Sequence, residues 1–237
     1  MSIFITGKNR PLSIELKKLI SNALCPDLNE IDLTSLIDIE TYFSKNDIDT
    51  VVHVDALYSV KDCEENKSLA MQMNFKNTKN LVDVVKKNPK IKFLFISTPC
   101  VFDGKDGMFL ESSIPYPVNF YGLTKLLAEK AVETLDNYLI IRTNYVARKP
   151  WPYSEAFTDR FSTYLFADQT AKAIVEILSE NLNGILHITG DRKISIYELA
   201  KITTPNVKPI TMENYSGPPL NVDMSLDTER WKKYTLT

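Results

Sequence analysis

Lys92–Ser97 (KFLFIS) and Tyr138–Arg142 (YLIIR) are two short apolar runs, and the longer stretch between them, Tyr121–Leu135, has an apolar face at helical spacing. β-Branched and aromatic residues dominate both runs, which is typical of strands buried on both faces. A strand, a helix and a second strand in this order predict a βαβ unit with parallel strands and a right-handed crossover. The segment therefore predicts an α/β fold.

The same alternation extends toward the N-terminus. Apolar runs at Ile3–Thr6 and Thr50–Val54 predict two more strands, and Leu28–Leu33 predicts a weaker one. Helical stretches lie between the runs, at Leu12–Ala23, Leu36–Phe43 and Glu64–Lys87. We therefore expect a Rossmann-like, doubly wound parallel sheet over residues 1–142, with ligands bound beyond the carboxyl ends of its strands.

The rhythm changes after the last of these runs. Residues 143–164 contain prolines and aromatic residues without periodicity and predict an irregular loop, whereas 167–179 predict a helix that returns to the sheet. In residues 180–237 we expect a strand at Gly184–Thr189 and a helix at Ser195–Ile202 that begins at a serine cap. Segments 143–166 and 180–237 together predict a small C-terminal substrate-binding lobe.

Composition argues against several functional classes. The 28 basic and 30 acidic residues give a net charge of −2, which offers no footprint for nucleic acid or an anionic membrane. No apolar run approaches the roughly 20 residues of a membrane span, and Met1–Gly7 lacks the basic region of a signal peptide. Three widely spaced cysteines, Cys25, Cys63 and Cys100, favour reduced thiols over disulfides or a metal site. We expect a cytoplasmic protein without metal.

Tyr121 and Lys125 are four residues apart on a predicted helix, so they share one face. A nearby ammonium favours the phenolate and lowers the pKa of the tyrosine toward neutrality, which suits proton transfer to or from a substrate oxygen. Without further context, a solvated surface pair is the simpler interpretation. Ser97 and Thr98 supply that context, because they end a predicted strand where a parallel sheet binds its ligands.

Two motifs in this region resemble a known family: Ser97-Thr98-x-x-Val101-Phe102-Asp103-Gly104 and Asn119-x-Tyr121-Gly122-x-Thr124-Lys125-x-x-x-Glu129. With them the chain resembles the extended short-chain dehydrogenase/reductases, and among these the dTDP-4-dehydrorhamnose reductase family. The resemblance implies that Tyr121 donates a proton, that Lys125 holds the nicotinamide ribose and that Thr98 polarises a ketone. It also implies NADP or NAD as cofactor and a nucleotide sugar as substrate, and we expect a homodimer.

The resemblance further implies which residues bind the cofactor: Gly7, Asn9, Arg10, Leu12, Asp32, Leu33, Asp55, Ala56, Tyr121 and Lys125. The loop after the first strand departs from the Gly-x-x-Gly-x-x-Gly pattern of the family, because Arg10 and Ser13 replace two glycines. After the third predicted strand, Asp55 replaces the first alanine of Ala-Ala-Tyr. We expect Arg10 to bind the cofactor phosphates and Asp55 to repel them.

Three functions are compatible with these residues. The first is an NAD(P)H-dependent reductase of a nucleotide-linked 4-keto-6-deoxy sugar, with the hydride added to C4. The second is a catalytically silent regulatory or partner subunit with weak or no cofactor binding, similar to the regulatory subunit of methionine adenosyltransferase. The third is a 4-epimerase of a sugar nucleotide, which the Ser97–Gly104 motif disfavours. The joint presence of Thr98, Tyr121 and Lys125 favours the reductase.

Overall fold

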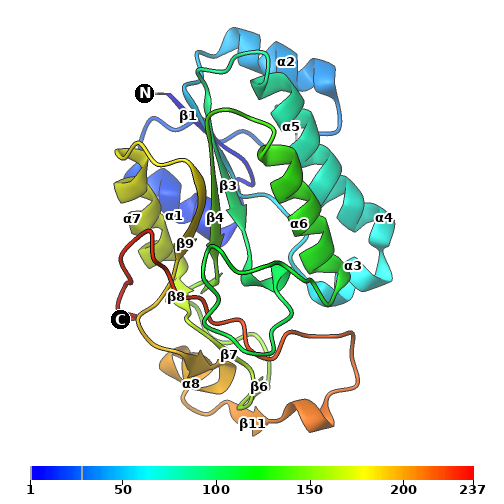
Figure 1. The fold of residues 1–237 in the computed structure, drawn as a ribbon, viewed down its shortest axis with the longest axis vertical. Helices are drawn as coiled ribbons and strands as arrows, with labels where there is room; N and C mark the ends of the chain where they lie inside the picture. The colour runs from blue at the N-terminus through cyan, green and yellow to red at the C-terminus, as the bar shows by residue number, and fades with distance from the viewer. Residues whose placement is uncertain (1, 28) are drawn as a thin grey trace.

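A five-stranded parallel sheet forms the centre of the protein, whose computed structural model describes residues 2–27 and 29–237 (Figure 1). In spatial order its strands are β1 (Ile3–Ile5), β2 (Thr50–His53), β3 (Lys92–Ser97), β4 (Tyr138–Thr143) and β9 (Gly184–Ile188). Every neighbouring pair in this sheet is parallel. The predicted α/β fold with a parallel sheet is therefore confirmed.

Helices cover both faces of this sheet (Figure 1). One face carries α1 (Pro11–Leu19) and α7 (Ala167–Leu178), and the other carries α2 (Leu36–Lys45), α5 (Asn77–Val85) and α6 (Phe120–Val132). Alternate residues along each strand face the two layers, so each face has its own apolar core. None of the helices in the described part of the chain is long and apolar enough to cross a membrane.

The stretch predicted as one helix, Glu64–Lys87, is a chain of shorter segments. They are α3 (Val60–Glu65), α4 (Lys67–Ala70), the π-helical turn η1 (Met71–Lys76) and α5. Asn66 interrupts the first two, since its backbone leaves the helical region and its side chain accepts a hydrogen bond from the Leu69 N–H. In η1, the buried Asn74 side chain binds the backbone of Leu57 and the Thr124 hydroxyl. Polar capping thus overrides the helical apolar pattern.

The weak strand expected at Leu28–Leu33 is wrong for residues 29–33, which form turns joined by irregular chain. Leu28 lies outside the described residues. The carboxylates of Asp27 and Asp32 accept backbone N–H hydrogen bonds from Asn29 and Thr34, so local turns satisfy the backbone in place of a strand ladder.

The C-terminal segments fold beyond the carboxyl ends of the sheet (Figure 1). Their elements are β5 (Tyr145–Val146), β6 (Glu155–Phe157), β7 (Phe161–Ser162), β8 (Leu165–Phe166), β10 (Ile194–Ser195), α8 (Ile196–Thr203), β11 (Lys208–Ile210) and the 3-10 helix η3 (Met212–Asn214). The segment expected to be irregular thus contains short strands, which pair as β5–β8, β6–β11 and β7–β10. As expected, Ser195 caps α8, accepting from the Glu198 N–H.

One strand differs from its predicted place. Gly184–Ile188 forms β9, but it pairs with β4 in the central sheet and not with the C-terminal lobe. Apolar residues from 143–166 and 180–237 form a separate small cluster, as a lobe built from these segments requires. The division of the chain into a cofactor domain and a substrate lobe remains a prediction.

A buried ion pair ties α6 to the sheet. Arg142, at the end of β4, donates from Nε and Nη2 to the two carboxylate oxygens of Glu129 at 3.0 and 2.7 Å, and both side chains are at most 1% exposed. The Ser97 hydroxyl at the end of β3 donates to the same carboxylate. Two strands and one helix are thereby held at fixed relative positions.

Glu129→Ala should lower the free energy of unfolding by about 3–5 kcal/mol, because it leaves the Arg142 guanidinium buried without its partner. Denaturant unfolding measures this loss. Glu133→Ala is the matched control, since Glu133, at the C-terminal end of the same helix, pairs with the exposed Lys130, and its loss should cost less than about 1 kcal/mol. Equal losses in the two variants would contradict the anchoring role.

Candidate functional site

The start of α6 places Tyr121 against the loop that follows β3. The Asn119 side chain caps the helix by accepting a hydrogen bond from the Gly122 N–H at 2.9 Å. A Cβ atom at Gly122 would lie 2.1 Å from the Cys100 carbonyl oxygen, in the 3-10 turn η2 (Pro99–Val101). Only glycine therefore permits this close approach of helix and loop.

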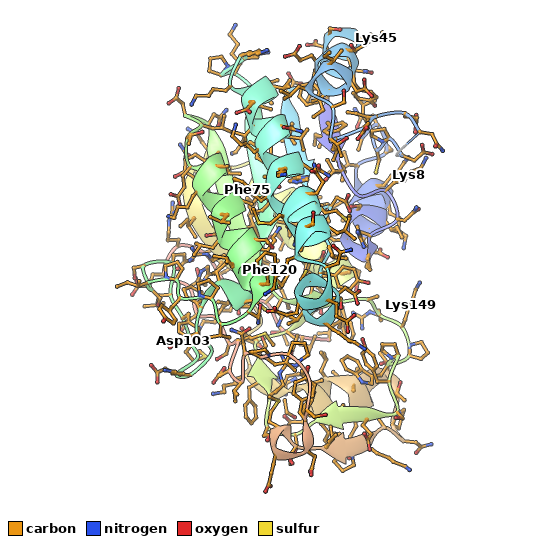
Figure 2. All side chains as sticks on the ribbon, turned by 90° about the vertical axis from the view of Figure 1, so that its right-hand side faces the viewer. Lys8, Lys45, Phe75, Asp103, Phe120 and Lys149 are labelled. Carbon is orange, nitrogen blue, oxygen red and sulfur yellow. The ribbon has the colours of Figure 1, made fainter. Side chains whose placement is uncertain are left out.

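A cavity of about 500 Å³, here called the Tyr121 cavity, opens at the carboxyl ends of β2, β3 and β4. Its lining includes Arg10, Val54, Ala56, Tyr58, Ile96, Thr98, Tyr121, Lys125, Thr143, Tyr145, Lys149 and Trp151. The structure thus brings together the three predicted catalytic residues. In Figure 2, Lys149 marks the junction between the α/β layers and the C-terminal segments, and Phe120, beside Tyr121, lies at the end of α6 that faces these segments.

Burial raises the pKa of Tyr121 well above its usual range, while a hydrogen bond with the Thr98 side chain lowers it by a smaller amount. The Thr98 hydroxyl also accepts a hydrogen bond from the Cys100 N–H at 3.2 Å. Tyr121 is therefore protonated at neutral pH, as a proton donor must be. The expected lowering of the Tyr121 pKa toward neutrality is wrong in this structure, because desolvation outweighs the hydrogen bond with Thr98.

The Lys125 ammonium faces the sheet. It donates a hydrogen bond to the Ile96 carbonyl at 2.7 Å and lies 3.9 Å from the centre of the Phe95 ring. The side chain is almost fully buried, and desolvation lowers the pKa of Lys125 to about 7, against the opposing charges of Glu129 and Asp55. An added negative charge near the ammonium would favour its protonated form.

A second cavity of about 550 Å³, here called the Gly7 cavity, lies beside the N-terminus of α1. Its lining includes six of the predicted cofactor residues: Gly7, Asn9, Arg10, Asp32, Leu33 and Asp55. Ala56 lines the Tyr121 cavity, together with Tyr121 and Lys125. Leu12 lines neither, because it is fully buried in the core between the sheet and α1.

Arg10 lines both cavities and forms an ion pair between them. Its Nε donates to Asp55 Oδ1 at 2.9 Å, and its guanidinium lies 5.3 Å from the centre of the Tyr58 ring. The Arg10 side chain is only 27% exposed and the Asp55 side chain only 16%. The two residues expected to act on the cofactor phosphates in opposite directions thus pair with each other in this structure.

Gly7 makes this ion pair geometrically feasible. Its φ of +73° lies in the left-handed region, and a Cβ there would approach Arg10 Cγ to 2.8 Å and Asp55 Cα to 3.1 Å. The loop after β1 therefore contacts the end of β2 through backbone that tolerates no side chain. Gly7 is the one glycine of the expected pattern that the chain has, since Arg10 and Ser13 take the other two positions.

Thr143 and Tyr145 also line the Tyr121 cavity, although neither was predicted as a site residue. Thr143 is the last residue of β4, and Thr98 directly follows β3. A hydroxyl residue at the carboxyl end of a parallel strand is the sequence feature that could have identified Thr143 as a site residue. Tyr145 lies in a segment without apolar periodicity, so no sequence feature identified it as a site residue.

A family model described as the RmlD substrate binding domain matches residues 1–163. The chain is 29% identical to a probable low-salt glycan biosynthesis reductase, Agl14, of Haloferax volcanii, over 72% of this chain and 63% of that protein. It therefore spans less than two thirds of that relative. A dTDP-4-keto-6-deoxy-D-glucose reductase of Streptomyces niveus is 23% identical over 88% of this chain and 81% of its own length. Methionine adenosyltransferase 2 subunit beta of Xenopus laevis is 25% identical, over 77% and 64%.

Solved structures extend the similarity to nearly the whole chain. A hypothetical dTDP-4-dehydrorhamnose reductase from Sulfolobus tokodaii is 32% identical with a TM-score of 0.85, covering 97% of this chain and 93% of its own. A dTDP-4-dehydrorhamnose reductase from Bacillus anthracis in complex with NADP has a TM-score of 0.87 at 20% identity, covering 95% and 90%. At that identity the second comparison supports the fold alone.

Lys125→Met should change how stability depends on pH. The pKa of Lys125 is about 7 in the folded protein, against 10.5 for an unburied lysine. Between these two pH values the unfolded chain therefore binds more protons than the folded one. Wild-type stability therefore gains up to about 1.4 kcal/mol per pH unit as the pH rises through this interval. Below pH 7 the folded wild-type protein carries the full cost of a buried charge. The stability advantage of Lys125→Met over wild type should therefore be largest below pH 7.

Denaturant unfolding at about pH 6.5 and about pH 9 measures this difference. The advantage of Lys125→Met over wild type should shrink at the higher pH. Lys130→Met serves as the control, since Lys130 is exposed and pairs with Glu133 on the same helix. A pH-independent difference between Lys125→Met and wild type would contradict the burial of a titrating ammonium.

Proposed function

Because this chain belongs to the RmlD substrate binding domain family, we propose that it is an NAD(P)H-dependent reductase of a nucleotide-linked 4-keto-6-deoxy sugar. One observation carries the proposal: Thr98, Tyr121 and Lys125 meet at one cavity at the carboxyl edge of a parallel sheet, where such folds bind their ligands. The Streptomyces niveus relative, named as a reductase of a dTDP-4-keto-6-deoxy sugar, supports the substrate class.

The side chains provide the acid chemistry of a ketone reduction. A bound NAD(P)H supplies the hydride that adds to the carbonyl carbon. Tyr121, kept protonated by its raised pKa, gives its proton to the carbonyl oxygen, while the Thr98 hydroxyl hydrogen-bonds the same oxygen. The Lys125 ammonium stabilises the negative charge that develops on the phenolate. The products are an alcohol, the oxidised cofactor and a deprotonated Tyr121.

The residues of the two cavities could hold a dinucleotide, with Arg10 as the cation for its diphosphate. The adenosine half would lie in the Gly7 cavity, beside Asp32 and Leu33, and the nicotinamide half in the Tyr121 cavity, beside Lys125. Arg10 lines both, and its guanidinium has the charge and geometry to bind phosphate oxygens. NADP and NAD both remain proposed cofactors: a Bacillus anthracis reductase was solved with NADP, and the neighbour MoeE5 with NAD.

We also propose that residues 143–166 and 180–237, apart from β9 in the central sheet, form the substrate lobe of a cytoplasmic homodimer. Lys149, Trp151 and Tyr145 from the first of these segments line the Tyr121 cavity, which supports contact with the sugar nucleotide. The three cysteines are free and buried, which suits a reducing compartment.

A second candidate function is a partner subunit without catalysis. The Arg10–Asp55 ion pair favours it, because the cation available for a diphosphate is already bound to a carboxylate. The relatives named methionine adenosyltransferase 2 subunit beta point in the same direction. The two candidates differ in turnover of a dTDP-4-keto-6-deoxy sugar with NAD(P)H, which only the reductase performs.

Tyr121→Phe should lower kcat about a hundredfold to ten-thousandfold, because it removes the general acid and leaves the ring in place. NAD(P)H oxidation with a dTDP-4-keto-6-deoxy sugar, followed by absorbance, measures turnover. Tyr116→Phe is the control, since Tyr116 is 72% exposed and outside the cavity, and it should retain wild-type activity. Full activity in Tyr121→Phe would exclude Tyr121 as the proton donor, and no wild-type turnover would favour the partner subunit.

Arg10 and Asp55 should affect cofactor affinity in opposite directions. Asp55→Ala frees the guanidinium for the diphosphate and should tighten NAD(P)H binding about tenfold, whereas Arg10→Ala leaves an unpaired carboxylate and should weaken it by a similar factor. The double variant should lie between them. Calorimetric titration measures all four affinities. Lys18→Ala, which removes an exposed charge from α1, should leave them unchanged; weaker binding in Asp55→Ala would contradict this role.

A further inference from the structure

Thr143 carries a buried hydroxyl without a hydrogen-bond partner. Among buried side-chain atoms of residues 2–27 and 29–237, three lack such a partner: Arg142 Nη1, Thr143 Oγ1 and His187 Nε2. Of these three residues, only Thr143 lines either cavity. A buried hydroxyl left unpaired lowers stability, so its retention beside the proposed reaction centre points to a ligand.

The strand register places Thr143 next to Thr98. The pairing of β3 with β4 ends at Ser97 and Arg142, so one further residue along each strand brings Thr98 and Thr143 side by side. Ser97 and Arg142 both bind Glu129 on the α6 face, and side chains alternate along a strand. Thr98 and Thr143 therefore project toward the opposite face, and both line the Tyr121 cavity.

The two hydroxyls are not equivalent. Thr98 already accepts from the Cys100 N–H and bonds Tyr121, and in the proposed reaction it serves the substrate ketone. Thr143 is uncommitted, and a threonine hydroxyl can both donate and accept a hydrogen bond. Apolar side chains such as Val54 and Ile96 form the adjoining wall, which suits a flat ring with one polar edge.

We propose that Thr143 is a cofactor-binding residue whose hydroxyl hydrogen-bonds the carboxamide of the nicotinamide ring. The carboxamide presents a donor and an acceptor on one edge of a flat ring, which matches both the hydroxyl and the apolar wall. The contact would orient the ring beside Tyr121 and Thr98. This inference rests on the proposed reductase function.

The test compares ligands with and without nicotinamide. Calorimetry measures the affinities of wild type, Thr143→Val and Thr143→Ser for four ligands. NADH is compared with ADP-ribose, and NADPH with 2′-phospho-ADP-ribose, because each of these counterparts lacks the nicotinamide ring. Thr143→Val should weaken binding of the preferred dinucleotide about threefold to tenfold and leave its counterpart unchanged. Thr143→Ser, which retains a hydroxyl, should bind like wild type.

A stability measurement separates this role from a structural one. Thr143→Val removes a hydroxyl that has no partner, so its Tm should equal or exceed that of wild type. Thr170→Val is the matched control: the buried Thr170 hydroxyl donates to the Phe166 carbonyl, so its loss should lower Tm and leave dinucleotide affinity unchanged.

The outcomes distinguish the two levels of the proposal. Wild-type dinucleotide affinity in Thr143→Val, or equal weakening with and without the ring, would overturn the carboxamide contact while the reductase function stands. If wild-type protein binds none of the four ligands, the reductase function fails and the Thr143 contact fails with it.

Discussion

The bidentate contact between Arg142 and Glu129 holds the proposed site in one geometry. Glu129 follows Lys125 by one helical turn and Tyr121 by two, so its bond to β4 sets both the rotation and the height of α6 over the sheet. Ser97 joins the same carboxylate and lies next to Thr98. An ion pair that excludes water tolerates little change in geometry, because each partner would otherwise be an unpaired buried charge.

Burial sets the charge state of this site. Tyr121 is neutral, Lys125 has a pKa of about 7, and Arg10 and Asp55 neutralise each other. In the Tyr121 cavity, Lys149 is therefore the remaining charged side chain among the lining residues. A dinucleotide diphosphate would add negative charge and favour the protonated form of Lys125. This arrangement would couple the binding of a dinucleotide to the protonation of Lys125.

Elements stabilised by apolar burial were predicted correctly, whereas segments shaped by polar side chains were not. Runs buried on both faces, such as Lys92–Ser97 and Tyr138–Arg142, became strands, since their apolar residues have no other stable placement. Leu28–Leu33 failed for residues 29–33, because aspartate side chains satisfy the backbone in turns. Glu64–Lys87 divided into segments where Asn66 caps a new helix. In both segments, hydrogen bonds from side chains to the backbone caused the difference from the predicted element. A pattern of apolar residues carries no information about such hydrogen bonds.

The sequence by itself determined the parallel α/β fold and the placement of Tyr121 and Lys125 on one helix face, since strand–helix alternation and i,i+4 spacing are local properties. Only the tertiary structure decided the states of these groups. The raised pKa of Tyr121, the Arg10–Asp55 contact and the unpaired Thr143 hydroxyl all depend on residues distant in sequence. Desolvation and hydrogen bonding arise from what surrounds a side chain, and that is settled when the strands and loops pack.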